Sequence, residues 1–180
     1  MTPNRKGTCK KVVSKSIFFK KTVIKKTVCK PPTGKKCVGK KVRRVRSAFR
    51  AIAGTEQNVM QDLFTKVRFQ VEEFDLNNEY NASTSTFRPR QSGIYSLLAS
   101  VSTETITMTP YTLDLEIRVN GVPRISDLEN FLPRPGIIDA SGIVQLRARD
   151  RVEVFLRSTF ENVIVQSGLA TRFEGNRVSG

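Results

Sequence analysis

The sequence contains no histidine and no tryptophan. Without histidine, the chain lacks the usual general base, the commonest zinc ligand and the usual pH switch. Serine- or cysteine-hydrolase triads of the ordinary kind are therefore excluded. A phosphate-binding glycine loop is also missing, because Thr33-Gly34-Lys35-Lys36 lacks the strand–loop–helix context of such loops. We predict that the protein is not an enzyme and needs no cofactor.

Cysteine is scarce and confined to one region. Cys9, Cys29 and Cys37 are the only three, and they are too few and too badly spaced for a zinc site. Cys29 and Cys37 flank a Pro-Pro-Thr-Gly turn and are placed to form a small loop if oxidised, but three free thiols fit the sequence equally well. Everything after residue 50 lacks cysteine, so packing must stabilise it.

Long apolar runs are absent from the N-terminal region. Its longest is Ile17-Phe18-Phe19, well short of the roughly 7–15 residues of a secretory signal and the roughly 20 of a membrane span. We expect neither of these segments.

Acidic residues are absent from the first fifty positions, which hold 18 Lys and Arg. From residue 51 onward, 13 basic residues face 16 acidic ones, so this part carries a net charge of −3. Such a division predicts two modules with different chemistry. We place a basic segment at residues 1–46 and a folded head at residues 47–180.

The basic segment repeats every five residues, with Lys or Arg at each fifth position from Arg5 to Lys40. This period fits neither a helix nor a half-buried strand, so we predict an extended and mostly disordered polycation. The candidate anionic-polymer-binding residues are Lys10, Lys11, Lys20, Lys21, Lys25, Lys26, Lys35, Lys36, Lys40 and Lys41. A solvated tail without a ligand is the alternative. Nucleic acid is a possible partner, but only without sequence preference, because Phe18 and Phe19 are the only aromatics available for stacking.

Short runs of alternating apolar and polar residues fill the head. The alternation predicts strands with one buried face, at 48–53, 65–70, 93–102, 112–119, 142–146, 152–158 and 162–166. Asn120-Gly121 predicts a type I′ hairpin turn, and Pro133–Gly136 a further turn. With no long helical pattern, the head is predicted to be an all-β sandwich, jelly roll or barrel.

Several motifs of the head resemble the C1q-like domain, a relative of tumour necrosis factor. They are Phe74-Asp75-Leu76-Asn77-Asn78-Glu79-Tyr80, Ser85-Thr86-Phe87, Ser92-Gly93-Ile94-Tyr95-Ser96, Val119-Asn120-Gly121, Asp150-Arg151-Val152-Glu153-Val154 and Thr171-Arg172-Phe173-Glu174-Gly175. Together they cover residues 47–180. The first is most similar to C1q-like proteins of endospore-forming bacteria, several of which belong to the spore surface.

The resemblance implies a ten-stranded jelly roll that assembles as a homotrimer. Core and subunit-seam positions would be Phe69, Phe74, Tyr80, Phe87, Tyr95 and Phe173. Gly93 and Gly175 would lie where the backbone needs room or positive φ. The lysine-rich segment stands where the family has a collagen-like stalk. Arg149 replaces a family glycine before Asp150, and we expect strain of about 1 kcal/mol if its φ is positive.

The densest acidic cluster is Glu72, Glu73, Asp75 and Glu79. A calcium or glycosidase site is conceivable there, but solvent-facing residues around a strand and loop are the preferred interpretation.

Two functions follow from these patterns. The leading one is a non-enzymatic trimeric head held by its polycationic segment on an anionic surface polymer or on spore-coat proteins. It would lie at a spore or cell surface, after a stage in the mother-cell cytoplasm. The alternative is a jelly-roll capsid or packaging protein whose basic arm binds nucleic acid.

Overall fold

Thirteen strands and no helix occur in the computed structural model, which describes residues 46–105 and 108–178. Ten of these strands have three residues or more. The basic segment, with its three cysteines, lies outside the described residues, so its predicted disorder stays a prediction. Its boundary with the head falls at the edge of the described residues. The all-β prediction is confirmed.

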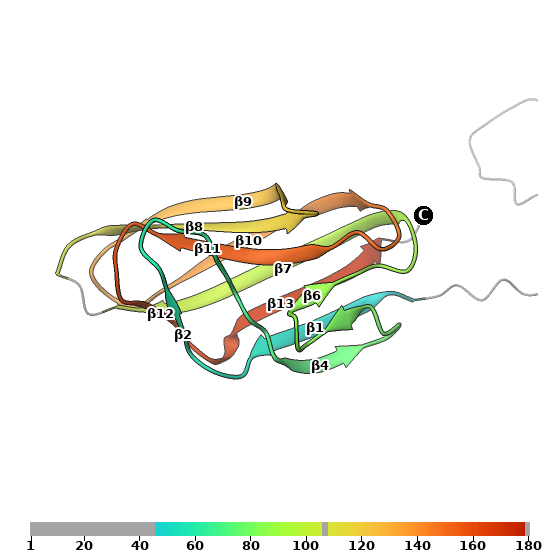
Figure 1. The fold of residues 1–180 in the computed structure, drawn as a ribbon, viewed down its shortest axis with the longest axis horizontal. Helices are drawn as coiled ribbons and strands as arrows, with labels where there is room; N and C mark the ends of the chain where they lie inside the picture. Colours follow the sequence, from blue (N-terminus) through green and yellow to red (C-terminus); the bar gives the residue numbers. More distant parts are fainter. Residues whose placement is uncertain (1–45, 106–107, 179–180) are drawn as a thin grey trace, which may run out of the picture. The chain divides into compact units, whose positions relative to one another are not determined.

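Two antiparallel sheets face each other (Figure 1). Sheet A has the order β2-β12-β7-β13-β1-β4, with β10 also paired to β7. Sheet B has the order β5-β6-β11-β8-β9, with β3 also paired to β11. The strands are β1 Ala48–Ala53, β2 Gln57–Val59, β3 Thr65–Lys66, β4 Val71–Asp75, β5 Tyr80–Asn81, β6 Thr86–Phe87, β7 Gly93–Glu104, β8 Tyr111–Val119, β9 Val122–Phe131, β10 Gly136–Leu146, β11 Val152–Ser158, β12 Val163–Val165 and β13 Gly168–Val178.

The predicted strand at 65–70 is wrong over most of its length. Only Thr65 and Lys66 pair with β11. Val67 and Phe69 are nevertheless fully buried, as their alternation predicted. Side chains take over part of the backbone pairing here, because Phe69 N donates to Ser85 Oγ at 2.8 Å and Arg68 N to Gln57 Oε1 at 2.9 Å.

Strands β2, β4, β5, β6, β9 and β13 and the first half of β10 were not predicted. The apolar residues of β9, Val122, Ile125, Leu128 and Phe131, recur every three positions, so they give no strand signal. Its pairing with β8 follows instead from the turn that joins them. Asn120 and Gly121 have φ values of 54° and 85°, as a type I′ turn requires.

The core fills the space between the sheets, and a group of aromatic rings lies at its centre. Phe49 stacks on Phe87 with ring centroids 4.4 Å apart and on Tyr80 at 5.1 Å, and meets the edge of Phe173 at 5.0 Å. Fully burying one such side chain is worth about 1.5–3 kcal/mol.

Both ends of the described chain lie at one end of the head (Figure 1). Arg177 N donates to Ser47 O at 2.9 Å, which joins the last strand to the residue before the first. The loops after β7, β9 and β11 lie at the opposite end. Within the described residues, no helix is present that could span a membrane.

Candidate functional site

The ten predicted anion-binding lysines, from Lys10 to Lys41, all lie outside the described residues. Their role therefore remains a prediction.

Five of the six predicted aromatic positions lie in the core, namely Phe69, Tyr80, Phe87, Tyr95 and Phe173. The two tyrosines keep a partner for their hydroxyl groups, since Tyr80 Oη donates to Phe69 O and Tyr95 Oη to Gln91 O, both at 2.8 Å. Burial raises the pKa of both tyrosines, so both remain neutral donors. Phe49 has the same role and was missed because it lies outside the recognised motifs.

Phe74 is different, because its side chain is 45% exposed on β4. A core position is wrong for this residue in the single chain. A position in a subunit seam remains a prediction.

The exposed Phe74 belongs to a larger apolar surface, the outer face of sheet A. Register places its outward side chains on five neighbouring strands, β10, β7, β13, β1 and β4. The larger apolar ones are Ile52, Val71, Phe74, Ile94, Leu98, Ile137, Ile143 and Val178. Six of these are more than 40% exposed. An apolar surface of this extent on a folded head points to a contact with another protein surface.

Charges at the centre of this face neutralise one another. Arg50 Nε lies 2.9 Å from Glu73 Oε2 and 3.3 Å from Glu174 Oε2, and Arg172 Nε lies 3.9 Å from Glu174 Oε1. Because both arginines already have carboxylate partners, covering the face would leave neither of these two cations unpaired.

A depression of about 280 Å³ crosses the same face. Phe74 and Ala48 line one side, and Leu98 and Ser96 the other. Gly175 forms its floor, and a Cβ there would lie 2.7 Å from Leu97 Cδ2 and 3.1 Å from Ser96 O. Glycine is therefore required at position 175 because the neighbouring atoms leave no room for a Cβ, and not because of a positive φ. At Gly93 a Cβ would likewise lie 2.6 Å from Arg177 Nε.

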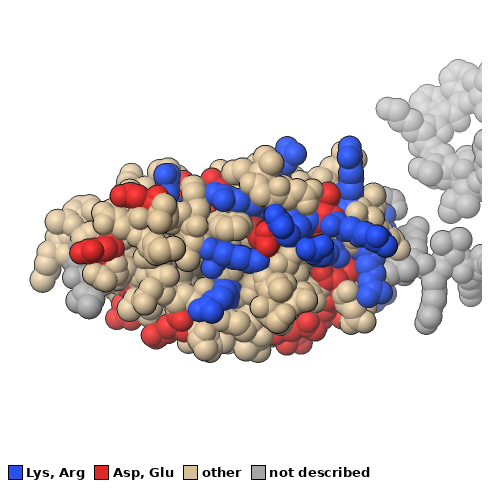
Figure 2. Space-filling model, in the orientation of Figure 1, with Lys and Arg blue, Asp and Glu red and all other residues tan. Residues whose placement is uncertain are grey.

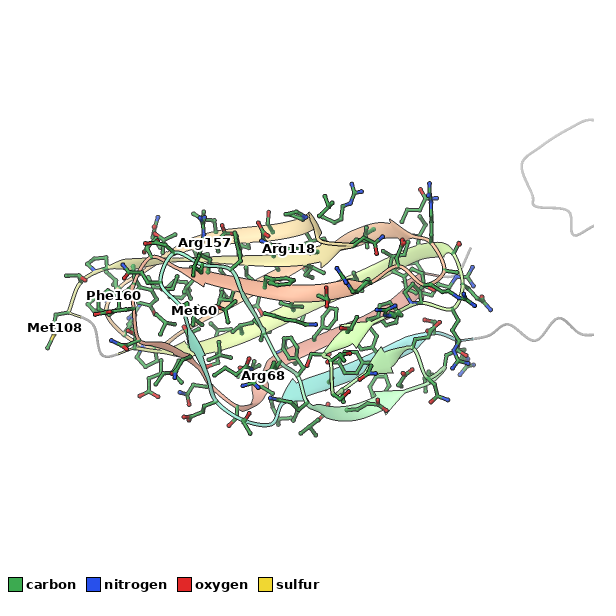
Figure 3. All side chains as sticks on the ribbon, viewed as in Figure 1. Met60, Arg68, Met108, Arg118, Arg157 and Phe160 are labelled. Carbon is green, nitrogen blue, oxygen red and sulfur yellow. The ribbon has the colours of Figure 1, made fainter. Side chains whose placement is uncertain are left out.

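The outer face of sheet B has a different surface. Figure 2 shows Lys and Arg side chains gathered over β8 and β11. The Arg118 guanidinium lies over the rings of Phe64 and Phe155, at 4.2 and 4.5 Å, and Arg157 over Phe64 at 4.8 Å (Figure 3). Arg118 also pairs with Glu116 at 2.5 Å. This face is covered by its own charged side chains.

Three carboxylates of the acidic cluster, those of Glu73, Asp75 and Glu79, are used in contacts within the fold. Asp75 accepts hydrogen bonds from the backbone N–H groups of Asn77, Glu79 and Tyr80, and Glu73 pairs with Arg50. Glu79 is buried rather than solvent-facing, because its carboxylate holds the loop together. Among the described residues, no group of three acidic or thiol side chains is arranged to hold a metal ion.

Arg149 does adopt positive φ, at 71°. The turn is held by Asp150, whose carboxylate accepts from Arg147 N at 2.7 Å and from Asn120 Nδ2 at 2.9 Å. The expected strain of about 1 kcal/mol is therefore present, and the neighbouring side chain ties the turn down.

Comparison with known proteins gives no match to a family model and none to a curated protein. Solved structures do match. The globular domain of zebrafish complement 1qA aligns with a TM-score of 0.53 and 14% identity, over 74% of this chain and 98% of that domain. Murine APRIL aligns with a TM-score of 0.58 and 14% identity, over 74% of this chain and 99% of its own. The head has a C1q/TNF-like fold. At this identity the likeness establishes the fold alone.

Proposed function

We propose that the chain is a non-enzymatic binding or structural protein whose C1q/TNF-like head forms a homotrimer. The outer face of sheet A carries this proposal. It combines exposed apolar side chains with arginines that are already neutralised by Glu73 and Glu174. Each copy would bury this face against its neighbours, in line with the assembly that the C1q-like motifs imply.

The lysine-rich segment would anchor this trimer to an anionic polymer at a spore or cell surface. The geometry of the head suits such an anchor. Residue 46 lies at the end opposite the loops that carry Met60, Met108 and Phe160 (Figure 3). An anchored head would therefore present those loops outward. Three copies would bring three segments of 17 basic residues to one surface, and their weak contacts would add by avidity.

Two measurements test the proposal on the full chain. Light scattering coupled to gel filtration should give three times the chain mass of 20.2 kDa. Immobilised teichoic acid should retain the wild-type protein at low salt, and replacing the ten candidate lysines by glutamine should abolish retention without changing the mass. A variant that is retained as strongly as the wild type contradicts the anchor, and a monomeric wild type contradicts the trimer.

The capsid or packaging function is tested by the same measurements. It requires large shells in light scattering and retention on immobilised DNA with a steep dependence on salt. Discrete trimers that bind teichoic acid better than DNA would count against it.

A further inference from the structure

A second depression lies on the other sheet, beside β5 and β6, with a volume of about 450 Å³. This volume is within the range of roughly 300–1,000 Å³ found for small-molecule sites. Its lining includes the polar side chains of Asn78, Asn81, Thr84, Thr86, Arg88 and Arg90. None of these residues belongs to the outer face of sheet A, which carries the proposal of a subunit contact.

The two arginines are available to a ligand. Both side chains are exposed, and within residues 46–105 and 108–178 neither forms an ion pair or a side-chain hydrogen bond. This sets them apart from Arg50, Arg118, Arg151, Arg157 and Arg172, which all have carboxylate partners. Two unpaired guanidinium groups on one depression form a receptor for an anionic group.

Their backbone is held in place by Glu79. Arg88 N donates to Glu79 O and Arg90 N donates to Glu79 Oε1, both at 2.6 Å. The Glu79 carboxylate also accepts from Ser47 Oγ and, at 3.0 Å, from Asn77 Nδ2. Glu79 is the one acidic residue in the lining, and it is only 4% exposed. The Glu79 carboxylate is therefore engaged by these donors and is shielded from a ligand in the depression.

The opposite rim is held by Lys66. Its ammonium donates to Thr84 O at 2.6 Å and to Thr86 Oγ1 at 3.1 Å, and it pairs with Glu153 at 2.6 Å. Glu153 is shared with Arg151, at 2.9 Å, so two cations face one anion at this rim. Burial acts to raise the pKa of Glu153, but the hydrogen bond and charge of Lys66, with Arg151, lower it on balance. The surroundings of the depression therefore retain positive charge.

We propose that this depression binds a saccharide unit that carries an anionic group, either a phosphate or a carboxylate. The guanidinium groups of Arg88 and Arg90 take the anion through paired N–H donors. The Asn78 amide and the Thr84 hydroxyl both donate and accept, as sugar hydroxyls require. The Asn81 amide can donate through Nδ2, because its Oδ1 already accepts from Ser83 Oγ and Thr84 N. Unlike the lysine-rich segment, this site would recognise one small unit by shape.

Residue-resolved NMR titration of the full, ¹⁵N-labelled chain tests the proposal, because it separates binding at the head from binding at the lysines. The probes are glucose 6-phosphate, glucuronate and uncharged glucose. We expect the anionic sugars to shift the amides of residues 78–90 with saturation, and the tighter of the two identifies the anion. Replacing Arg88 and Arg90 by glutamine should weaken this binding at least tenfold.

The matched control is Arg124→Gln with Arg134→Gln, which removes the same charge from exposed arginines outside the depression. It should bind as the wild type does. Equal affinity in the Arg88/Arg90 variant, shifts confined to the basic segment, or equal binding of glucose would each overturn the proposal. These outcomes are independent of the oligomer mass and of surface attachment, so the failure of one proposal leaves the other intact.

Discussion

The outer faces of the two sheets differ in how they use charge. On sheet A, the charged side chains pair among themselves at the centre and leave apolar residues such as Ile94, Ile143 and Phe74 exposed around them. On sheet B, Arg118 and Arg157 spread over the rings of Phe64 and Phe155, so the same kinds of residue cover the apolar surface. The first arrangement leaves apolar area for a partner, and the second completes its own covering.

The difference between the two faces is tested most directly by placing a charge at the centre of the outer face of sheet A. Leu98→Arg, between Glu174 and Ser141 in the register, should reduce the oligomer to a monomer. Three copies would each bury a cation without enough carboxylate partners. Light scattering measures the mass, and circular dichroism checks that the head remains folded.

Leu128→Arg on β9, 59% exposed on sheet B, is the control and should keep the trimer mass. If both variants dissociate, or neither does, sheet A is not the interface.

The floor of the sheet A depression gives the next largest effect. Gly175→Ala would place a Cβ against Leu97, Phe49 and the Ser96 carbonyl, and should lower the free energy of unfolding by about 1–3 kcal/mol. In Gly142→Ala the new Cβ meets only the side chain of Ile125, at 3.2 Å, and should have much less effect. Urea denaturation measures both, and equal losses would show that Gly175 is not tightly packed.

On sheet B, removing the stacked guanidinium should have a smaller effect. Arg118→Ala loses two ring contacts and the pair with Glu116, and we expect a loss of about 1–2 kcal/mol in unfolding free energy with no change in mass. Arg124→Ala, an exposed arginine on β9, should stay within about 0.5 kcal/mol of the wild type. Comparable losses in the two variants would mean that the stacking contributes nothing.

The smallest expected effect concerns how the free energy of unfolding changes at acidic pH. Because the pKa of Glu153 is lower in the fold than in the unfolded chain, its contribution is present at neutral pH and disappears as the pH falls through the folded value. Lys66→Met should therefore reduce the unfolding free energy at neutral pH, and the difference from the wild type should shrink in acid. A difference that does not change with pH would contradict this linkage.

The sequence predicted those parts of the fold where side chains alternate. β1 and β11 were predicted to the residue, and β8 and β12 to within one residue at each end, because each has one face in the core. β9 was missed because it is an edge strand whose residues are mostly exposed, so that pairing with β8 specifies it rather than its own pattern.

The candidate surfaces were less predictable for the same kind of reason. Phe74 lies in a recognised motif, but the motif does not say whether an aromatic residue faces the core or a neighbouring subunit. The pairing of Arg50 with Glu73 and Glu174 joins β1, β4 and β13. The sequence could not predict it, because Glu174 is far away in the chain and the register between β1 and β4 shifts after Arg50. The backbone of Arg88 and Arg90 is held by hydrogen bonds to Glu79, eleven residues before Arg90. The local sequence around the two arginines gives no sign of this contact.

The hydrogen bond between Arg177 and Ser47 holds the two ends of the head close together, so the head is suited to circular permutation. A short linker could join the two chain ends, and the turn at Pro133–Gly136 offers an exposed place to open the chain at the other end. If the lysine-rich segment anchors the head as we propose, a permuted head with this segment fused at the new start would have the opposite orientation on the surface. The surface around the old chain ends, including the turn at Arg149, would then face outward in place of the loops.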